Sequence, residues 1–332
     1  MTDKKININV GSGGRQMHEF ISEVILKKLG NQILNIMDDS AVVDIKGSKK
    51  IAMTSDSYVV SPVFFDGGDI GRLCVCGTVN DLATSGAKAK YLSLSFIIEE
   101  GASLIDLEKI VNSIAATAKE AGVLIVTGDT KVVEKGKADV LYINTTGVGL
   151  LDDKTKLSTH NAQDNDIVMV TGNIGDHEVA LIKARKLVDF DINVKSDVAP
   201  LNKKVEELLK ITDDVHCIKD PTRGGLAGAL NEIASNSICD IKIFEDSVPF
   251  SDGVKSVCNL IGFDPMYLAS EGKYVIICNP KSELAVKKIF GDKASVIGVI
   301  KKSQKGAVLV ETSFGGVRKL SVLDSIQLPR IC

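Results

Sequence analysis

The spacing of apolar and polar positions predicts a first half that mixes helices and strands. Residues 17–30 and 103–122 place apolar side chains at helical spacing, and the second of these helices is expected to end at Gly122. Strand-like runs, in which apolar residues alternate or are continuous, cover residues 49–60, 90–100, 123–133 and 140–151. This half is therefore expected to form one mixed α+β domain.

A polar stretch at residues 151–166 interrupts the pattern, which then begins again. The second half is expected to contain a strand within 167–176, helices at 177–186, 203–212 and 220–237, and strands near 273–280 and 307–312. With 332 residues the chain also exceeds the usual size of a single core. We therefore expect two domains of mixed α/β structure, residues 1–152 and 153–319, and a mobile tail at 320–332.

Composition narrows the classes of function. The formal net charge of -3 provides no basic surface for nucleic acid. The first ten residues lack the apolar region of a signal peptide, and no run approaches the ~18 apolar residues of a membrane span. These features predict a cytoplasmic protein that binds neither nucleic acid nor membrane.

The seven cysteines have spacings that fit neither a zinc site nor a disulfide framework. Five of them lie among apolar neighbours and are expected to be inert core thiols: Cys74, Cys217, Cys239, Cys258 and Cys278. Cys332 differs because it is the last residue, and the end of a chain is usually its most mobile part. A reactive side chain in that position calls for a functional explanation.

The segment "GSGGRQMH" places three glycines, Gly11, Gly13 and Gly14, before the first helix. Glycines let the backbone approach a ligand closely, and the N–H groups at a helix start bind anions. The segment has neither the lysine of a P-loop nor the spacing of a dinucleotide fingerprint. It is therefore either an anion-binding loop or a flexible N-terminal arm.

Three aspartates, Asp39, Asp56 and Asp81, lie beside apolar runs rather than in charged patches. A carboxylate in such a position needs a partner, and each of the three could simply cap a helix or a turn. If they converge, a hard cation would offset their repulsion. Mg²⁺ accepts such oxygen ligands together with substrate phosphates.

Two further segments carry polar residues at the ends of apolar runs. Asp129 and Lys131, in "TGDTK", directly follow an apolar strand, where α/β proteins tend to place ligand contacts. The segment "DPTRGG" sets Asp220, Arg223 and Gly224 at the start of a helix, a position suited to binding phosphate or a metal ion.

Taken together, these segments resemble the HypE family of hydrogenase maturation proteins. The resemblance runs in order from Gly11 to Cys332 and is carried by "GSGGRQMHEFI", "IVTGDTKVVEKGKAD", "IGDHEVA", "SDVAPLN", "DPTRGGLAGALNEIA", "SEGK" and the terminal "LPRIC". The family belongs to a superfamily of ATP-using enzymes that includes aminoimidazole ribonucleotide (AIR) synthetase and selenophosphate synthetase.

The resemblance implies a PurM-like (AIR synthetase-like) fold of two domains, a homodimer joined through N-terminal-domain strands, and ATP with Mg²⁺ in a cleft between the domains. It also implies a reaction. The partner HypF loads a carbamoyl group onto Cys332, and the protein uses ATP to dehydrate this thiocarbamate to a thiocyanate. The cyano group then passes to iron on a HypC–HypD complex, on the route to the nickel–iron hydrogenase centre.

The same resemblance assigns roles to residues. The metal ligands would be Asp39, Asp56, Asp81 and, less directly, Asp220. The nucleotide would contact Gly11, Gly13, Gly14, Asp129, Arg223 and Gly224. Lys131 and Glu271 would lie near the carbamoyl group, with Glu271 as the preferred base and Lys131 stabilising negative charge, although the two roles could be exchanged.

Two rival functions stay open on the residues alone. One is a phosphotransferase of the same superfamily that acts on a small free substrate, which the terminal cysteine argues against. The other is a non-catalytic thiol carrier. Pro329 favours an extended tail, which from Lys319 reaches at most about 45 Å. Whether this tail is docked, and whether it serves its own subunit or the partner's, the sequence leaves open.

Overall fold

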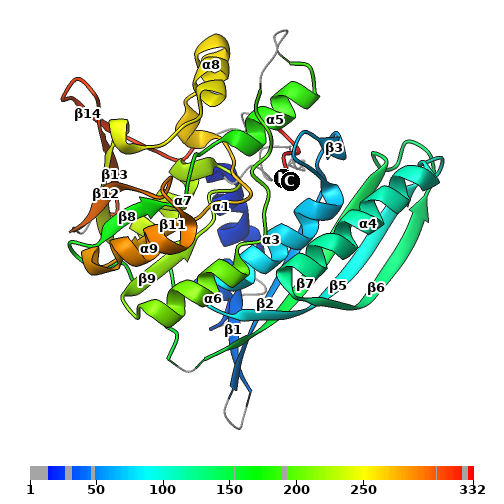
Figure 1. Ribbon diagram of the computed structural model, residues 1–332, viewed down its shortest axis with the longest axis horizontal. Coiled ribbons are helices and arrows are strands. Elements are labelled where there is room, and N and C mark those ends of the chain that lie inside the picture. The colour runs from blue at the N-terminus through cyan, green and yellow to red at the C-terminus, as the bar shows by residue number, and fades with distance from the viewer. Residues whose placement is uncertain are drawn as a thin grey trace, which may run out of the picture.

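The protein, seen here as a computed structural model, is built around two sheets (Figure 1). The structure describes residues 14–26, 32–45, 49–152, 154–187, 193–303, 305–323 and 328–332. Among these residues, one sheet has five strands in the order β1-β2-β7-β5-β6 and another has seven in the order β14-β13-β10-β12-β8-β11-β9. The predicted mixed α/β fold in two halves is thus present.

The helices, with short 3-10 and π segments marked η, are α1 (Arg15–Phe20), η2 (Ile21–Leu26), η3 (Leu34–Ile36), α3 (Ile70–Thr84), α4 (Leu104–Ala121), α5 (Asp176–Ala184), α6 (Asn202–Ile211), α7 (Gly225–Asn236), η4 (Glu245–Ser247), α8 (Asp252–Ile261), η5 (Pro265–Tyr267), η6 (Pro280–Ser282) and α9 (Glu283–Phe290). The strands are β1 (Ala41–Ile45), β2 (Lys49–Tyr58), β3 (Phe64–Phe65), β4 (Gly68–Asp69), β5 (Lys88–Glu99), β6 (Leu124–Val133), β7 (Leu141–Leu151), β8 (Ile167–Val170), β9 (Val215–Lys219), β10 (Cys239–Phe244), β11 (Val275–Cys278), β12 (Ser295–Lys302), β13 (Val308–Glu311) and β14 (Val317–Lys319).

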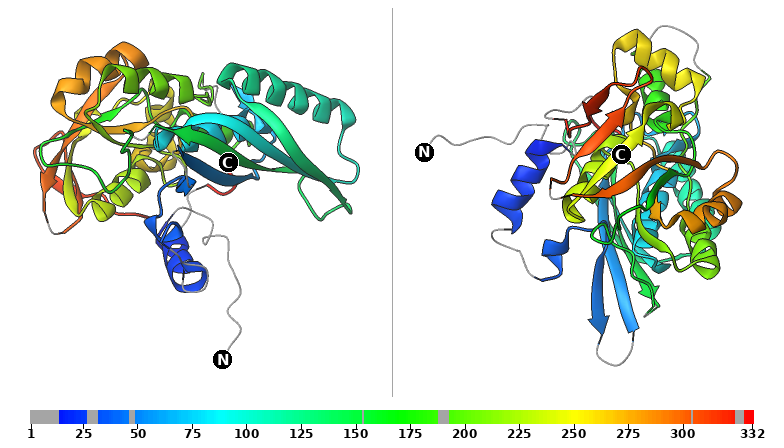
Figure 2. Two further views of the ribbon diagram at one scale, coloured as in Figure 1. Left: turned by 90° about the horizontal axis from the view of Figure 1, so that it is seen from below. Right: turned by 90° about the vertical axis from the view of Figure 1, so that its left-hand side faces the viewer.

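Helices α3 and α4 cover one face of the five-stranded sheet (Figures 1 and 2). Strand β5 pairs antiparallel with β7 and parallel with β6, so that Tyr91 lies opposite Leu124 and Ile97 opposite Lys131. Tyr91 and Ile97 are six residues apart and share a face of β5, and each directly paired residue of β6 lies on the same face as its partner, because a register shift between Ile125 and Thr127 restores the match. The neighbouring Leu92 is buried in the core cluster around α3, so the four residues face away from α3 and α4. That face exposes several large apolar side chains, including Tyr91, Ile97 and Leu124. We call it the free face.

The predicted helix at 103–122 is confirmed as α4. The hydroxyl of Ser103 accepts a hydrogen bond from the N–H of Asp106, which caps the start of the helix. Gly122 ends it in the left-handed conformation, with a φ of 77°. The first predicted helix is confirmed as α1 continued by the π-helical η2, while its expected stop, Gly30, lies outside the described residues.

The prediction that Asp129 and Lys131 follow a strand is wrong, because β6 continues through both residues to Val133. The β-branched Thr130 and Val132 favour extended structure, and the pairing with β5 persists to the Glu99–Val133 pair. Gly128 permits a close approach of the two strands, since a Cβ there would lie 1.9 Å from the carbonyl oxygen of Leu94.

Strands β8 and β11 of the seven-stranded sheet in the second domain are buried on both faces. Along β8, Val168 and Val170 pack into one core cluster with residues of α7, while Ile167 and Met169 pack into another with residues of α6 and α9. Such two-sided burial explains the continuous apolar run of this strand. The polar stretch before it contains neither helix nor strand in its described part beyond Leu151.

The cysteines behave largely as predicted. All seven are free, and the five predicted core thiols are buried, as is Cys76. Cys332 is only partly buried and packs against the core of the first domain. No helix in the described part of the chain combines the length and the apolar character needed to cross a membrane.

The end of the chain lies against the first domain, beside α5 and β3 (Figure 1). Leu328 and Ile331 are each 7% exposed and belong to the core cluster around α3. Leu320, where the tail was expected to begin, is fully buried in the core of the second domain. The mobility of residues 320–332 and the domain bounds at 152 and 319 stay predictions.

Candidate active site

A polar pocket of about 210 Å³ lies where the two domains meet the end of the chain. Its walls come from β2, α3, the turn before α7, the loop before β11 and the C-terminus. The lining residues are Asp39, Thr54, Ser55, Asp56, Gly77, Asp81, Asp220, Thr222, Arg223, Glu271 and Cys332. The structure therefore brings together all four predicted metal ligands with Arg223, Glu271 and Cys332. We call this space the acidic pocket.

Strand β2 and helix α3 supply one wall. Thr54 and Asp56 are two residues apart on β2, so their side chains share the face toward α3. The hydroxyl of Thr54 donates a 2.9 Å hydrogen bond to Oδ2 of Asp81. Gly77 allows α3 to approach β2 this closely, because a Cβ there would lie 2.3 Å from the Tyr58 hydroxyl. The hydrogen bond fixes the Asp81 carboxylate at the edge of the pocket.

Asp39 enters the pocket next to a buried lysine. Its carboxylate accepts a short hydrogen bond from Nζ of Lys219, the last residue of β9, and Nζ lies 2.9 Å from Oε2 of Glu232. Burial alone would lower the pKa of Lys219, but the charges of Asp39 and Glu232 raise it well above its usual value. Lys219 is therefore a fixed positive charge beneath the aspartates.

The turn between β9 and α7 supplies Asp220 and Arg223. Gly224 and Gly225 turn the chain into α7 with φ angles of 79° and 60°, and a Cβ on Gly225 would lie 2.5 Å from the carbonyl carbon of Tyr267. Only glycine fits that combination of backbone angle and contact. The turn holds Arg223 at the pocket, where the Cys332 end of the chain raises the arginine pKa.

Glu271 is held by a tight loop. Its backbone N–H donates a 3.0 Å hydrogen bond to Oδ1 of Asp197, and a Cβ on Gly272 would lie 1.8 Å from the Asp197 carbonyl oxygen. The Glu271 side chain is 3% exposed, and its Oε1 has no hydrogen-bond partner among the described residues. Burial raises the pKa of Glu271 well above its usual value, and the nearby Asp220 charge adds to the shift. A carboxylate in this state has a high affinity for a proton.

Cys332 reaches the same pocket from the end of the chain. Its carbonyl oxygen accepts a 3.0 Å hydrogen bond from the N–H of Val59. Burial raises the thiol pKa, the Arg223 charge partly opposes this shift, and the Glu271 carboxylate adds to it. A docked Cys332 is therefore a thiol rather than a thiolate at neutral pH, and a poor nucleophile.

The carboxylates of the acidic pocket crowd one another. Burial raises the pKa of Asp81 well above its usual value, with Asp220 and Asp56 as the next causes. Burial and the Asp39 charge likewise raise the pKa of Asp220 to about 7. A divalent cation would offset this repulsion.

The pocket suits Mg²⁺ with a phosphate ligand better than a closed protein cage. No three His, Cys, Asp or Glu side chains in the described part of the chain are close enough to hold a metal ion together. Mg²⁺ generally takes one or two carboxylates and completes its shell with phosphate oxygens and water. Asp81 together with Asp56 or Asp220 meets that requirement, whereas Asp39 is paired with Lys219.

Lys131 and Asp129 are not part of this pocket. Both project from the free face of β6, where Nζ of Lys131 lies 2.7 Å from Oδ2 of Asp129 and the Lys131 side chain is 68% exposed. The hydrogen bond from Lys131 lowers the pKa of Asp129. Within one chain they do not approach Glu271, so their predicted roles stay predictions.

The glycine segment is only partly described. Gly11 and Gly13 lie outside the described residues. Gly14 is buried at the start of α1, where its carbonyl oxygen accepts the N–H of His18 at 3.2 Å. Gly224 is the N-cap of α7. Nucleotide contacts for these glycines stay predictions.

Sequence reasoning missed Lys219, which is paired with Asp39, and two threonines that line the pocket. Lys219 carried a usable signal, because it ends an apolar run directly before Asp220. Thr54 and Thr222 carried none, since isolated threonines beside apolar residues are common. Their place at the pocket depends on which strand faces α3 and on the path of the turn before α7.

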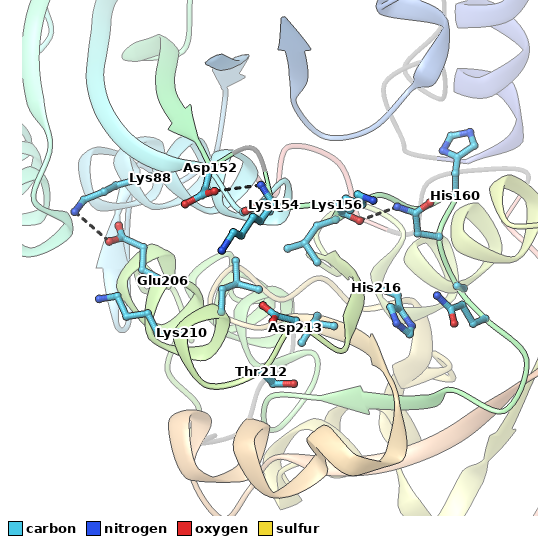
Figure 3. Close-up of a pocket in the computed structure, with 18 residues that line it drawn as sticks. Lys88, Asp152, Lys154, Lys156, His160, Glu206, Lys210, Thr212, Asp213 and His216 are labelled. Atoms are coloured by element: carbon cyan, nitrogen blue, oxygen red, sulfur yellow. Dashed lines mark hydrogen bonds and ion pairs between the residues drawn. The ribbon is translucent and has the colours of Figure 1, made fainter. Parts of the chain in front are cut away.

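A larger pocket of about 900 Å³ lies elsewhere, under the junction between the domains (Figure 3). Lysines such as Lys88, Lys154 and Lys210 surround it, and Nζ of Lys88 lies 3.6 Å from Oε2 of Glu206. None of the predicted site residues lines it. Size alone therefore does not mark the candidate active site of this protein.

The two halves of the chain match known protein families. Residues 37–151 match the N-terminal domain of AIR synthase related proteins, and residues 163–311 match the C-terminal domain. Fold and pocket thus place the protein in the AIR synthase related class.

Closer relatives define the family within this class. The carbamoyl dehydratase HypE of Bradyrhizobium diazoefficiens is 44% identical over 98% of this chain and 96% of its own. A crystal structure of HypE in complex with ATP has a TM-score of 0.82 and 43% identity, over 99% of this chain and 100% of that chain. A HypE–HypF complex has a TM-score of 0.85 and 43% identity, over 92% and 99%. The chain belongs to the HypE family of carbamoyl dehydratases, which confirms the resemblance.

Proposed function

We propose that this protein is an ATP-dependent carbamoyl dehydratase whose substrate is the carbamoyl group on its own Cys332. The observation that carries the proposal is the meeting of Cys332, the buried Glu271 and the crowded aspartates in one pocket. Relatives named carbamoyl dehydratase and a crystal structure of HypE in complex with ATP support the same activity.

Three adjoining pockets offer a path for ATP. The acidic pocket shares Asp39, Thr54 and Ser55 with a pocket of about 350 Å³, which shares Met37 with a third of about 730 Å³. The middle pocket has apolar walls that suit a flat base: Leu26, Ile33, Ile36, Met37, Val42 and Met53. We place the phosphates at the polar end, where Arg223 offers positive charge.

Dehydration requires that the carbamoyl oxygen become a leaving group. That oxygen attacks the γ-phosphorus of ATP, the bond to the bridging oxygen of ADP breaks, and the nitrogen gives up one proton. The resulting phosphorylated imidate then loses its second N–H proton as the C–O bond breaks, phosphate leaves and the C≡N bond forms. The net change is the loss of one water from the tail and conversion of ATP to ADP and phosphate.

The residues of the pocket match these needs. Glu271, buried and with a raised pKa, is the base for the nitrogen protons. Arg223 faces the developing charge on the phosphoryl group. Asp81 together with Asp56 or Asp220 would hold Mg²⁺, which when bound would neutralise phosphate charge. Positioning and charge compensation supply most of the catalysis in phosphoryl transfer.

Mass spectrometry of the C-terminal peptide tests the proposal. The protein is carbamoylated on Cys332 by a carbamoyltransferase and then incubated with or without ATP. We expect an adduct of carbamoyl mass without ATP and the loss of one water from that adduct with ATP. A carbamoyl adduct that ATP leaves unchanged would instead support a thiol carrier. Phosphate release that does not depend on the loaded tail would support a phosphotransferase.

Asp81→Asn is expected to separate nucleotide binding from stability. The substitution removes a metal ligand, so the affinity for Mg²⁺–ATP should fall by about 100-fold. This is the upper end of the loss in metal affinity that substitutions around a metal site usually cause. It also relieves carboxylate crowding, so the Tm of the nucleotide-free protein rises by about 3 °C, the shift that about 1 kcal/mol produces at this domain size. Calorimetric titration and thermal unfolding measure the two effects. A lower Tm would contradict the crowding argument.

We further propose that the protein forms a homodimer through the free face of the five-stranded sheet. Exposed apolar residues gather on the strands of this sheet, among them Met53, Tyr91, Leu124 and Val126. An apolar face of this kind marks a protein interface. Lys131 shares the free face and lies away from its own acidic pocket, so we place it at the active site of the partner subunit.

Mixed dimers of Lys131→Ala and Glu271→Gln subunits test this arrangement. If Lys131 acts across the interface, a mixed dimer has one intact site, and random mixing restores about a quarter of the wild-type activity. If Lys131 acts in its own chain, no site is intact and no activity returns. Sedimentation velocity of the same samples shows whether dimers are present.

Partners and location complete the proposal. The solved complex of the relative HypE with HypF supports a carbamoyltransferase as the loading partner. By family resemblance, a HypC–HypD complex receives the cyano group. Seven free cysteines, none of them in a disulfide, suit a reducing compartment and hence the cytoplasm. A stable cyanated tail after incubation with iron-loaded HypC–HypD would contradict the assigned acceptor.

A further inference from the structure

One arginine, directly after the end of α5, donates hydrogen bonds to the backbone of the C-terminal tail. Arg185 donates from Nη1 to the carbonyl oxygen of Pro329 at 2.7 Å and from Nη2 to that of Arg330 at 2.6 Å. Its Nε donates to the carbonyl oxygen of Ser61 at 2.6 Å. The guanidinium thus joins two tail residues to the segment after β2. Charged donors make stronger hydrogen bonds than neutral ones.

A histidine at the other end of α5 holds the next residue. Nε2 of His177 lies 2.8 Å from the carbonyl oxygen of Ile331. Because a carbonyl oxygen only accepts, Nε2 carries the hydrogen, and Nδ1 accepts from the Ser196 hydroxyl at 2.7 Å. Burial lowers the pKa of His177, which favours this neutral form. The Ser196 oxygen also accepts the N–H of Val198 at 3.2 Å, which helps to orient the hydroxyl.

The tail also pairs with the chain that follows β2. The N–H of Val59 donates to the carbonyl oxygen of Cys332 at 3.0 Å, and the N–H of Ser61 donates to that of Arg330 at 3.3 Å. This is the pattern of a short antiparallel pair. Together with Arg185 and His177, it gives the carbonyl of every residue from Pro329 to Cys332 a donor.

The tail bends sharply just before the pocket. Arg330 has a φ of 58°, a left-handed conformation that costs a non-glycine residue about 1–2 kcal/mol. Its side chain is held by an ion pair with Asp139 and by a 2.9 Å hydrogen bond to the carbonyl oxygen of Val59. The bend directs Ile331 onto His177 and Cys332 into the acidic pocket. Without the contacts from α5, this backbone conformation would be unfavourable.

We propose that Arg185 and His177, at opposite ends of α5, form a clamp that positions the C-terminal tail in its own subunit's pocket for the ATP-dependent step. The proposal rests on the dehydratase function proposed above. Both are positioning residues, since they touch the tail backbone and not the reacting carbamoyl group. Because they contact main-chain oxygens, the clamp holds the tail whether Cys332 is free, carbamoylated or cyanated.

The clamp implies a division between two states of the tail. Docked, Cys332 is partly buried in the acidic pocket and paired through its backbone with Val59, a position unsuited to attack a carbamoyl donor held by another protein. Loading therefore requires an open clamp, while dehydration requires a closed one. Weakening the clamp should spare the first reaction and impair the second.

The experiment compares Arg185→Ala with the wild type and with Lys186→Ala, an exposed neighbour that serves as the control. Alkylation of Cys332 in the native, unloaded protein, followed by mass spectrometry, reports docking without any catalysis. We expect Arg185→Ala to raise the alkylation rate about 10- to 100-fold, as the loss of charge-assisted hydrogen bonds predicts. It should also leave carbamoylation by the carbamoyltransferase at least as fast, and slow the ATP-dependent loss of water by a similar factor.

Two further readings keep the outcome clear. The six buried cysteines report misfolding, because they react with the alkylating reagent only if the protein opens. If they do react in Arg185→Ala, Arg185→Lys replaces that variant and should give an intermediate alkylation rate at Cys332. An unchanged alkylation rate at Cys332 would overturn the clamp, whatever the catalytic result. Faster alkylation in a protein that never dehydrates its tail, even as wild type, would support the clamp and refute the dehydratase function.

Discussion

Replacing Cys332 with alanine is expected to abolish carbamoyl loading and, with it, the tail-dependent release of phosphate from ATP. The loss should be complete, because the Cys332 sulfur forms the bond to the carbamoyl group. The oxygen that attacks ATP belongs to that carbamoyl group, so an unloaded tail cannot release phosphate. Intact-mass spectrometry measures the first effect, and phosphate release in the presence of a carbamoyltransferase measures the second.

Cys332→Ser is the matched variant. It keeps the length of the tail and its main-chain hydrogen bonds to Val59 and Arg185 but replaces the thiol with a hydroxyl that does not ionise at neutral pH. We expect it to fail in loading while docking normally. Cys258→Ala, at a buried cysteine away from the acidic pocket, should load as the wild type does. A carbamoyl adduct on the Cys332→Ala protein would disprove the assigned acceptor.

Much of the fold could be predicted because local signals agreed with the final packing. The amphipathic pattern of α4 coincides with its caps, Ser103 and Gly122, so the helix and its end could be predicted from sequence alone. The strand β6 was predicted with nearly its observed bounds, but its polar residues Asp129 and Lys131 were also expected to follow the strand, whereas pairing with β5 holds them within it. Tertiary pairing decided that element.

The candidate site shows a similar division. The four aspartates and Glu271 were found by motif, and the structure brings them together at the acidic pocket. The motif could not tell that Lys131 lies on the free face, since that depends on the alternation of side chains along β6. The contacts of Arg185 left no trace in the sequence, because their partners are main-chain carbonyls that any tail residue would provide.

Glu271→Gln is expected to leave carbamoyl loading unchanged and to slow the ATP-dependent loss of water by about 10²- to 10⁴-fold, the range that general-base catalysis contributes. The substitution keeps the size of the side chain and removes its ability to take a proton. Loading is spared because Cys332 is modified away from the pocket that holds Glu271. Single-turnover conversion of the loaded tail, followed by mass spectrometry with excess ATP, measures the rate.

The pH profile makes this prediction specific to a base. Glu271 must be ionised to accept a proton, and burial raises its pKa well above the ordinary glutamate value. The wild-type rate should therefore rise with pH through that raised pKa and fall below it, and this rise should vanish in Glu271→Gln. Glu178→Gln is the control, since Glu178 is equally buried but lies outside the pocket, where its Oε2 accepts the N–H of Ala269 at 2.8 Å. If Glu271→Gln keeps both the rate and the pH rise while Lys131→Ala loses them, the roles of the two residues are exchanged and the proton leaves through the lysine.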